Sequence, residues 1–359
     1  MAVEIGAIRE PRWTRPALLR REAPLRPDLA PWTGDPLRVV LEGEVPVEGV
    51  SLEGAAGVYP LIVVSRQFRD GFTHVGCATR PLPEGLYDLF VFRRGAARLV
   101  SPHAVASVAE RDAFTLAHIS DLHLLKDVAG ALVDQTDRVA ALVDRLNRLA
   151  PALVVCTGDV VSRHGAEKEP LSAEAVEWQA RRAQELLLGL RMPLFMVVGN
   201  HDQAFGYSRT AWHRYMGRPW DRPTDDYGLD FSGCHLAFVD GYARYDGANR
   251  LVERSMTMEQ LLWLHQDMRQ AREARWRLLF IHYDYGGELT PLLPELRADM
   301  LFYGHSDKPI PADLEALGIR NGHLLDREAY RLVRVSPKAL RDKAVPWDKL
   351  MEGASRRKK

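Results

Sequence analysis

The spacing of hydrophobic and polar positions changes character near residue 113. Before that point the apolar residues form short alternating stretches separated by Gly and Pro, which is typical of β-strands. After it, strand-like runs alternate with longer segments whose apolar residues recur at i, i+3, i+4 and i+7, the period of an amphipathic helix. The pattern therefore predicts a small all-β sandwich domain over residues 35–112, followed by an α/β domain over residues 113–336.

Individual elements can be placed on this pattern. N-terminal strands are predicted at Leu37–Leu41, Val58–Ser65, Phe72–Ala78, Leu86–Phe92, Ala97–Val100 and Val105–Val108. Helices are predicted at Asp134–Leu149, Ser172–Leu190 and Thr257–Glu273. Strands of the α/β domain are predicted at Thr115–Ile119, Leu153–Cys156, Leu194–Val198, Leu278–Ile281 and Met300–Tyr303, with strand-like pieces over Leu324–Val335.

Both ends of the chain lack a sustained period. Residues 1–34 are rich in Arg and Pro, which predicts an irregular arm. Residues 337–359 form a polar, basic tail, and the last five residues carry four cationic side chains. This composition favours a solvated tail over a dedicated nucleic-acid arm, so we assign the tail no function.

Composition narrows the functional classes. The 48 Lys and Arg balance the 48 Asp and Glu, so no overall field attracts the chain to nucleic acid or to an anionic membrane. The three cysteines, Cys77, Cys156 and Cys234, are too few for a disulfide framework. No apolar run before residue 35 is long enough for a signal peptide or a spanning helix, so we expect a soluble, cytoplasmic protein.

Polar residues directly follow five of the predicted strands. They are Asp121-Leu122-His123, Gly158-Asp159, Gly199-Asn200-His201-Asp202, His282 and Gly304-His305-Ser306-Asp307. Open α/β sheets bind ligands at the carboxyl ends of their strands, so we expect these residues to lie together. Asp121 and His123 are one residue apart on extended chain, so both can reach one metal ion. Asp159 follows a glycine and has two oxygens, which suits a bridging carboxylate.

The order and types of these residues resemble the calcineurin-like metallophosphoesterase family. Its pattern is Asp-Xaa-His, Gly-Asp, Gly-Asn-His-Asp/Glu, His and Gly-His-Xaa-His, and the resemblance covers Phe114 to Val335. It implies a two-sheet sandwich flanked by helices, with two metal ions at the strand ends. The implied reaction is hydrolysis of a phosphate monoester or diester by a metal-bridging hydroxide.

The resemblance also implies a role for each residue. The first ion takes Asp121, His123, Asp159 and the residue at position 307, and the second takes Asp159, Asn200, His282 and His305. His201 is expected to stabilise charge and to protonate the leaving oxygen. Asp202 is expected to orient His201, although an N-cap of a following helix explains an aspartate there equally well.

Asp307 departs from the family pattern, which has a histidine there, and it leaves three interpretations open. It can ligate the first ion directly, and a set of three carboxylates and one imidazole favours Mn or Fe over Zn. It can act through a water, because aspartate is shorter than histidine. Or the first site is weak, which leaves a single-ion or impaired enzyme. The expected cofactors are two divalent or trivalent metal ions, with Mn or Fe favoured and Zn allowed.

Two other functions stay open at this point. One is a nuclease, against which the balanced charge argues. The other is a metal-binding scaffold without turnover, whose β-rich domain binds a protein partner. Arg163 and His164 are either contacts for a phosphoryl oxygen or solvated loop residues. Five further residues either line the mouth of the pocket, where they would stack on an aromatic leaving group, or are packing residues, and packing is favoured. They are Tyr207, Trp212, His213, Tyr283 and Tyr285.

Overall fold

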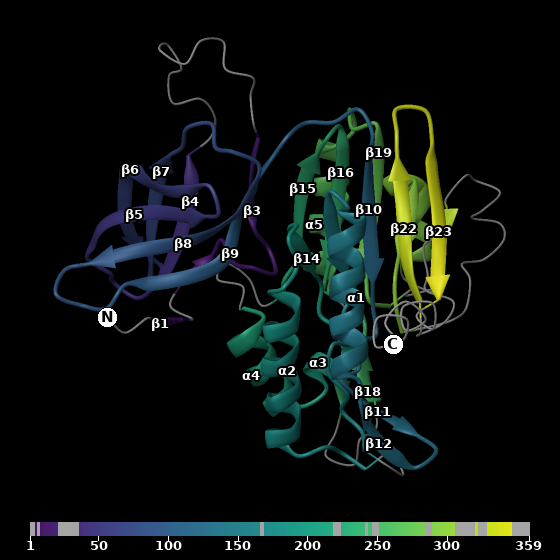
Figure 1. Cartoon of the computed structure of the whole chain (residues 1–359). Coiled ribbons are helices and arrows are strands. Elements are labelled where there is room, and N and C mark those ends of the chain that lie inside the picture. Colours follow the sequence, from purple (N-terminus) through teal and green to yellow (C-terminus); the bar gives the residue numbers. More distant parts are fainter. Residues whose placement is uncertain are drawn as a thin grey trace, which may run out of the picture. The chain divides into compact units, whose positions relative to one another are not determined.

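Figure 1 shows a computed structural model of the chain, which divides into two compact units. The first comprises residues 1–111, 191–195 and 216–221, and the second comprises residues 112–190, 196–215 and 222–359. The structure describes residues 4–5, 8–20, 36–165, 169–217, 224–240, 243–245, 251–283, 289–305, 320–321 and 329–346. No helix in these ranges is both long enough and apolar enough to span a membrane.

The N-terminal strands form one continuously hydrogen-bonded sheet (Figure 1). They are β1 (Glu4–Ile5), β2 (Ile8–Glu10), β3 (Ala17–Arg20), β4 (Leu37–Glu42), β5 (Val47–Gly54), β6 (Gly57–Arg69), β7 (Phe72–Ala78), β8 (Gly85–Arg93) and β9 (Leu99–Val108). Their order is β1-β9-β8-β5-β6-β7-β4-β2, with β3 paired to β9. The first residues of β6 pair with β5 and its later residues pair with β7. Side chains from both halves, including Leu52 and Val75, pack into one core, which gives the expected β-sandwich.

Short strands occupy part of the segment for which the sequence predicted an irregular arm. β2 pairs with β4, and β3 pairs in parallel with β9. These strands have three and four residues, which is too short for a periodic pattern to be visible among the prolines. The prediction is therefore corrected for Ile8–Glu10 and Ala17–Arg20, whereas residues 21–35 lie outside the described residues.

The second unit contains two five-stranded sheets. The first has the order β14-β13-β10-β22-β23, with β10 (Phe114–Ile119), β13 (Leu153–Cys156), β14 (Leu194–Met196), β22 (Ala329–Val335) and β23 (Leu340–Pro346). The second has the order β15-β16-β19-β20-β21, with β15 (Tyr227–Phe231), β16 (Cys234–Val239), β19 (Trp276–Ile281), β20 (Met300–Phe302) and β21 (Arg320–Asn321). Two small hairpins accompany them, β11 (Leu125–Val128) with β12 (Ala131–Asp134) and β17 (Ala243–Tyr245) with β18 (Leu251–Arg254).

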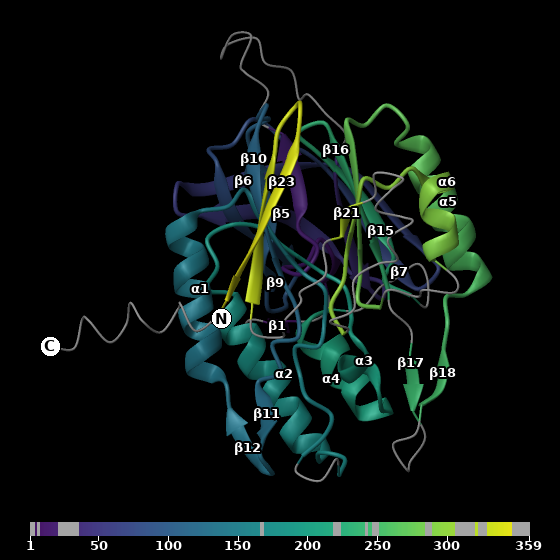
Figure 2. The same ribbon diagram turned by 90° about the vertical axis from the view of Figure 1, so that its right-hand side faces the viewer.

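The described part of this unit also contains helices, some of which cover the outer faces of the two sheets (Figure 2). They are α1 (Thr136–Leu149), α2 (Ala173–Leu187), α3 (Asn200–Gln203), α4 (Gly206–Tyr215), α5 (Met258–Gln270) and α6 (Leu293–Leu296). Figure 2 shows α1 on one outer side and α5 with α6 on the other. Leu264 of α5 and Leu293 of α6 pack with Leu279 and Leu301 of the second sheet. The predicted two-sheet sandwich flanked by helices is thus confirmed.

An aromatic ladder joins the strands of the second sheet on the face toward the first. Tyr227, Phe238, Phe280 and Phe302 lie opposite one another in register, with ring centroids 4.4, 5.0 and 4.5 Å apart. His118 of β10 meets Phe280 and Phe302 edge-on. The Tyr227 hydroxyl also donates to the carbonyl of Met196 at 2.9 Å. The edge-on contacts of His118 and this hydrogen bond therefore join the two sheets.

Several strands were absent from the sequence prediction or placed differently, among them β5, both small hairpins and β21. Three further cases have a physical explanation. The hairpin of β15 and β16 turns at Ser232 and Gly233, both with positive φ, and this two-residue turn is a hairpin signal. β23 lies in the segment predicted to be a polar tail, and it is polar because it is an exposed edge strand. β9 is one continuous strand where the sequence predicted two. The predicted break coincides with an irregularity, because His103 has a φ of 48° and the pairing with β8 shifts register near it.

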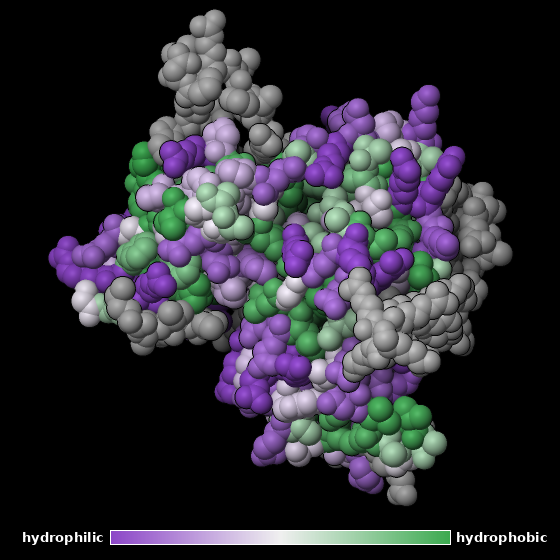
Figure 3. Space-filling model, viewed as in Figure 1, coloured by the Kyte–Doolittle hydropathy of each residue, from purple (hydrophilic) through white to green (hydrophobic). Residues whose placement is uncertain are grey.

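The hairpin of β11 and β12 carries apolar side chains into solvent. Val128, Leu132 and Val133 are 48%, 41% and 39% exposed, and Figure 3 shows the green patch that they form at the lower edge. The hairpin lies on the segment that connects β10 to α1. It therefore places an apolar surface on the loop that begins with the predicted metal ligands.

A histidine bridges the second sheet and its outer helix. His235 Nδ1 lies 2.8 Å from Asp230 Oδ1 of the neighbouring strand, and His235 Nε2 lies 2.8 Å from Asp267 Oδ2 of α5. Burial lowers the pKa of His235, but the hydrogen bonds and charges of Asp267 and Asp230 outweigh burial and raise it. A raised pKa means that the protonated His235 stabilises the folded state relative to the unfolded state. This contribution to the free energy of unfolding is fully present below about pH 6.5, the ordinary pKa of histidine.

We expect this stabilisation to be lost as pH rises through the raised pKa of His235. The measurement is the melting temperature of wild type and His235→Gln at pH 5.5 and pH 8.5. Wild type should exceed the variant by more at pH 5.5 than at pH 8.5. The control is His265→Gln, since His265 is an exposed histidine of α5. Its difference in melting temperature from wild type should not change with pH in this way. An equal gap at both pH values for His235→Gln contradicts the expectation.

Candidate metal centre

The loop after β10 presents the first two predicted ligands. Asp121 and His123 are buried, and both adopt left-handed backbone conformations, with φ of 53° and 42°. Their amides donate to the carbonyls of Gly158 and Asp159 at 2.9 and 3.1 Å. His123 Nδ1 lies 3.2 Å from the Val161 carbonyl and donates to it, because a carbonyl only accepts. This leaves Nε2 of His123 facing Asp121 Oδ1 at 3.6 Å.

Asp159 lies at the middle of the predicted site. Its Oδ2 is 3.2 Å from His282 Nε2, 3.8 Å from His123 Nε2 and 3.9 Å from His201 Nε2. Its Oδ1 accepts the amide of His201 at 2.8 Å, which fixes the carboxylate. One oxygen of a buried carboxylate thus faces three imidazoles, as a bridging ligand requires.

The second predicted set of ligands also converges. Asn200 Oδ1 lies 2.9 Å from His282 Nε2 and 2.8 Å from His305 Nδ1. His282 donates from Nδ1 to the Thr157 carbonyl at 2.7 Å, which turns Nε2 toward Asn200 and Asp159. Asn200 and His282 are fully buried, and His305 is partly buried.

These residues fit two metal ions. Ligand atoms of His123, Asp159 and His201 lie within 4.8 Å of one another, and so do those of Asp159, His282 and His305. The two groups share only Asp159. In addition, Asp121 Oδ1 is buried without a hydrogen-bond partner among the described residues. Imidazole, carboxylate and amide donors with an orphaned oxygen suit divalent or trivalent transition metals.

The protonation of the group follows from burial and mutual charge. Burial lowers the pKa of His282, but Asp159 and Asp121 raise it to about 9. Burial raises the pKa of Asp121, whereas the adjacent imidazole of His123 and the charge of His282 lower it to about 2. The pKa of Asp159 is likewise lowered well below its usual range, because the charges of His282 and His201 outweigh burial. Both carboxylates are therefore anionic at neutral pH, as metal ligands must be.

His201 is held in one tautomer. Its Nδ1 accepts the backbone amide of Arg163 at 3.1 Å, so in the neutral ring the proton is on Nε2. Burial lowers the pKa of His201 well below its usual range, so the ring is neutral at pH 7. Nε2–H therefore lies toward Asp159, whose Oδ2 is 3.9 Å away.

Asp202 has a different partner from the one predicted. Its carboxylate accepts the amides of Asp159, Val160, Val161 and Gly199 at 2.8, 3.0, 3.1 and 2.9 Å, and no hydrogen bond to His201 is present among the described residues. The orienting role is thus corrected: Arg163 fixes His201, and Asp202 fixes the loop of Asp159. Asp202 is also not the N-cap of α3, because that position is Gly199. Asp202 is the third residue of α3, and its carboxylate accepts the backbone amide of the N-cap residue.

Glycines let the loops approach to backbone distance. A Cβ at Gly199 would collide with the amide and the carboxylate of Asp159, and a Cβ at Gly158 would collide with Gly199. A Cβ at Gly304 would collide with Ser120 Oγ and Asp121 Oδ2. The glycines that precede Asp159, Asn200 and His305 are therefore required by contact.

A buried glutamine was missed in the sequence. Gln179 lies on the apolar face of α2 and is fully buried. Its Oε1 accepts the amides of Leu125 at 3.1 Å and Ser162 at 2.7 Å, which ties the loops after β10 and β13 together. A polar residue within an apolar helical stripe was the available signal. Gln179 is a positioning residue for both ligand loops.

The remaining predicted residues fall into three groups. His164 is partly buried, with its ring 5.6 Å from that of His201, and Tyr283 is buried and packs its ring 4.4 Å from that of His305. Tyr207 and Trp212 pack on α4, where the Tyr207 hydroxyl donates to the Leu171 carbonyl at 2.8 Å. Asp307 and Tyr285 lie outside the described residues.

Two stacked sheets, strand-end ligands and a carboxylate shared by two ligand groups define the class of two-metal α/β hydrolases. The sequence model of the calcineurin-like phosphoesterase family matches residues 114–309, more than half of the chain. The protein belongs to the calcineurin-like phosphoesterase family. No sequence among the curated proteins matches closely enough to count as a relative.

Solved structures resemble the chain in fold. A purple acid phosphatase from yellow lupin (Lupinus luteus) seeds matches 89% of this chain and 74% of its own, with 11% identity and a TM-score of 0.50. PhoD matches 86% of each chain, with 10% identity and a TM-score of 0.48. A dimetal phosphatase from Danio rerio matches 65% of this chain and 99% of its own, with 14% identity and a TM-score of 0.46. At such identities the purple acid phosphatase supports the fold alone.

Proposed function

We propose that the protein hydrolyses phosphate monoesters or diesters at this centre, with two metal ions as cofactors. The observation that carries the proposal is Asp159, whose Oδ2 faces the imidazoles of both ligand groups. When bound, two such ions supply an activated water and positive charge for the phosphoryl oxygens.

The residues of the chain would hold the two ions and position the loops that carry the ligands. Asp159, Asn200, His282 and His305 hold one ion, and Asp121, His123 and Asp159 hold the other. Asp202 and Gln179 keep the loops in place through backbone amides.

His201 stabilises the charge that develops on the departing group. Its neutral ring holds a proton on Nε2 because the amide of Arg163 occupies Nδ1. A neutral imidazole is too weak an acid to give that proton away, so Nε2–H would hydrogen-bond to the leaving oxygen as the ester bond breaks, and the alcohol would take its proton from solvent.

Hydrolysis of p-nitrophenyl phosphate and bis-p-nitrophenyl phosphate tests the proposal. The full chain is freed of metal with a chelator, and rates are measured before and after addition of Mn²⁺, Fe²⁺ or Zn²⁺. We expect activity only with metal, and its return on addition of Mn²⁺ or Fe²⁺. If the chain binds two ions per molecule but hydrolyses neither ester, it is a metal-binding scaffold and the proposal fails.

Replacing His201 with glutamine should lower kcat by about 10²- to 10³-fold, the usual contribution of a hydrogen-bond donor that stabilises developing charge. Such a donor matters most for poor leaving groups, so the loss should be larger for phenyl phosphate than for p-nitrophenyl phosphate. Metal analysis supplies the control, since the variant should keep both ions. An equal loss for both esters, together with one missing ion, identifies His201 as a ligand instead.

We further propose that Asp307 ligates the first ion and that its third carboxylate favours Mn or Fe. Asp307→His should shift the metal recovered with the chain toward Zn, since imidazole suits Zn as well as Fe. Elemental analysis of the two proteins, purified side by side, measures this. Unchanged metal content and identity contradict a ligand role for Asp307.

A further inference from the structure

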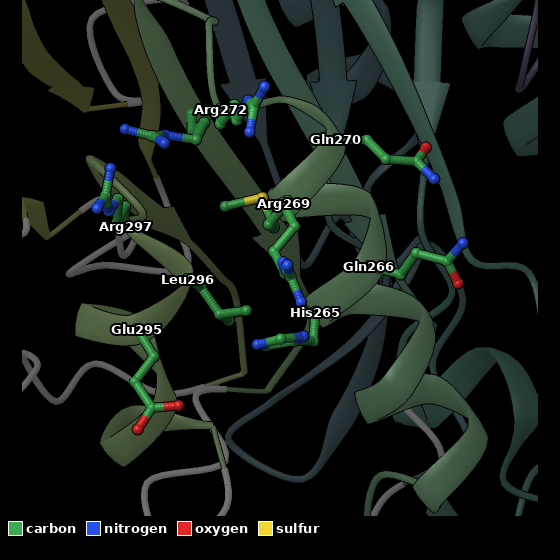
Figure 4. A pocket seen from close by; sticks show the side chains of 10 residues that line it. His265, Gln266, Arg269, Gln270, Arg272, Glu295, Leu296 and Arg297 are labelled. Atoms are coloured by element: carbon green, nitrogen blue, oxygen red, sulfur yellow. The ribbon is translucent and has the colours of Figure 1, made fainter.

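A cavity of about 820 Å³ lies beside α5 and α6, on the outer side of the second sheet (Figure 4). Its apolar part is made by Met268 and Leu296, which belong to the core beneath the helices. We call it the arginine cavity, because its lining includes Arg269, Arg272, Arg277 and Arg297. Glu295 is the one carboxylate among its lining residues, so four positive charges stand against one negative charge, a net charge of +3.

These arginines are poorly neutralised by the protein. Among the described residues, no hydrogen bond or ion pair engages the guanidinium of Arg269 or of Arg297. Nε of Arg277 is buried and also has no hydrogen-bond partner in the described part of the chain. Arg272 lies 3.4 Å from Glu273, but both side chains are exposed, so this pair contributes little. The guanidinium charges of Arg269 and Arg297 are therefore available to a ligand, whereas Arg277 also lies near the carboxylate of Asp299, whose pKa burial raises and the charge of Arg277 partly lowers.

The fold brings the four side chains together from separate elements. Arg269 is in the last turn of α5 and Arg272 follows that helix. Arg277 is the second residue of β19, and Arg297 is the C-cap of α6 with a φ of 51°. Figure 4 shows His265 and Arg269 on the side of α5 that faces Leu296 and Arg297, with Gln266 and Gln270 pointing the other way. Like charges gathered around a hollow repel one another unless an anion lies between them.

The arginine cavity is remote from the metal centre. Arg277 and His282 are five residues apart on β19 and the loop that follows, which corresponds to roughly 16 Å of extended strand. Arg297 likewise precedes β20, and His305 follows β20. The cavity thus lies toward the amino ends of the strands whose carboxyl ends carry metal ligands, and it is too far away to hold the ester that reacts there.

We propose that the arginine cavity binds a small molecule with two or more phosphate groups, at a site separate from the metal centre. Guanidinium groups bind phosphate oxygens in pairs, and a net charge of +3 requires more than one phosphate for balance. The volume is that of a small-molecule site, and Met268 and Leu296 provide contact for the apolar part of the ligand. The balanced charge of the whole chain, 48 against 48, argues for a local ligand rather than a nucleic acid.

Inorganic pyrophosphate is the probe, and calorimetric titration of the metal-free full chain is the measurement. Removing the metals leaves the carboxylates of the centre, which repel anions. We expect one pyrophosphate per chain, with a Kd that rises at least tenfold in the double variant Arg269→Ala/Arg297→Ala. Arg275→Ala is the matched control, because Arg275 is an exposed arginine that does not line the cavity; its Kd should stay within twofold of wild type.

Several results would overturn the proposal. One is that pyrophosphate does not bind. Another is that Arg275→Ala raises the Kd for pyrophosphate as much as the double variant does. A third is that the chain binds a single-stranded oligonucleotide tightly but does not bind pyrophosphate. A second measurement uses the metal-loaded chain and bis-p-nitrophenyl phosphate, for which the double variant should keep at least half of the wild-type rate. A tenfold loss there would make the cavity part of the substrate site. If wild type shows no hydrolysis at all, the phosphoesterase proposal fails while the calorimetric result still decides this one.

Discussion

Replacing Asp159 with asparagine should abolish metal-dependent hydrolysis, with kcat lowered at least ~10³-fold. Charge stabilisation by bound metals is worth several kcal/mol, and each 1.4 kcal/mol is tenfold in rate. The amide keeps the shape of the side chain, but it removes the negative charge that faces His123, His201 and His282. Because both ligand groups share this residue, the variant should lose both ions rather than one.

Elemental analysis and the rate of ester hydrolysis measure the two effects on the same samples. Asp144→Asn is the matched control, since Asp144 is an exposed aspartate of α1, and it should leave rate and metal content unchanged. A variant that keeps one tightly bound ion and a tenth or more of the wild-type activity would show that Asp159 does not bridge.

Replacing Gly199 with alanine should damage the centre without touching any ligand. The added methyl would collide with the amide and the carboxylate of Asp159, so the loops after β13 and β14 must separate. Forcing a group into packed structure costs about 1–3 kcal/mol, and displacing a catalytic group by about 1 Å can cost 10²-fold in rate. We expect a lower melting temperature and a rate reduced by about 10²-fold or more.

Gly206→Ala provides the comparison. A Cβ at Gly206 meets nothing within 4 Å, and this residue begins α4 with an ordinary negative φ. Alanine is the better helix former, so this variant should be as stable as wild type or slightly more stable. If Gly199→Ala behaves like Gly206→Ala in thermal denaturation and turnover, the close approach of the two loops has no energetic consequence.

The sequence predicted that the polar side chains of the centre lie together because each one follows an apolar run. Buried strands such as Leu153–Cys156 and Leu278–Ile281 are hydrophobic throughout, so the first polar residue after each marks the edge of the sheet. Asp159 and His282 could thus be placed next to each other before any coordinates. The helices α1, α2 and α5 were predicted for the same reason, from periodic apolar faces.

The contacts that orient these ligands could not be predicted. The tautomers of His123 and His201 depend on the carbonyl of Val161 and the amide of Arg163, and every residue carries such groups. Which backbone group meets which ring is decided by loops in left-handed conformations, for example at Asp159, where φ is 54°. Asp202 is an example. An aspartate next to His201 suggested that the two side chains pair, but in the folded chain its carboxylate accepts four backbone amides instead.

The ligands come from two separately hydrogen-bonded sheets, which links metal affinity to folding. Asp121, Asp159 and Asn200 follow strands of the first sheet, and His282 and His305 follow strands of the second. A chain in which only one sheet has formed has an incomplete ligand set, so free metal binds the fully docked state and adds RT ln(1 + [M]/Kd) to its stability. If the proposed ligands bind metal, bound ions would therefore stabilise the contact between the two sheets in a concentration-dependent way, and metal depletion would weaken that contact.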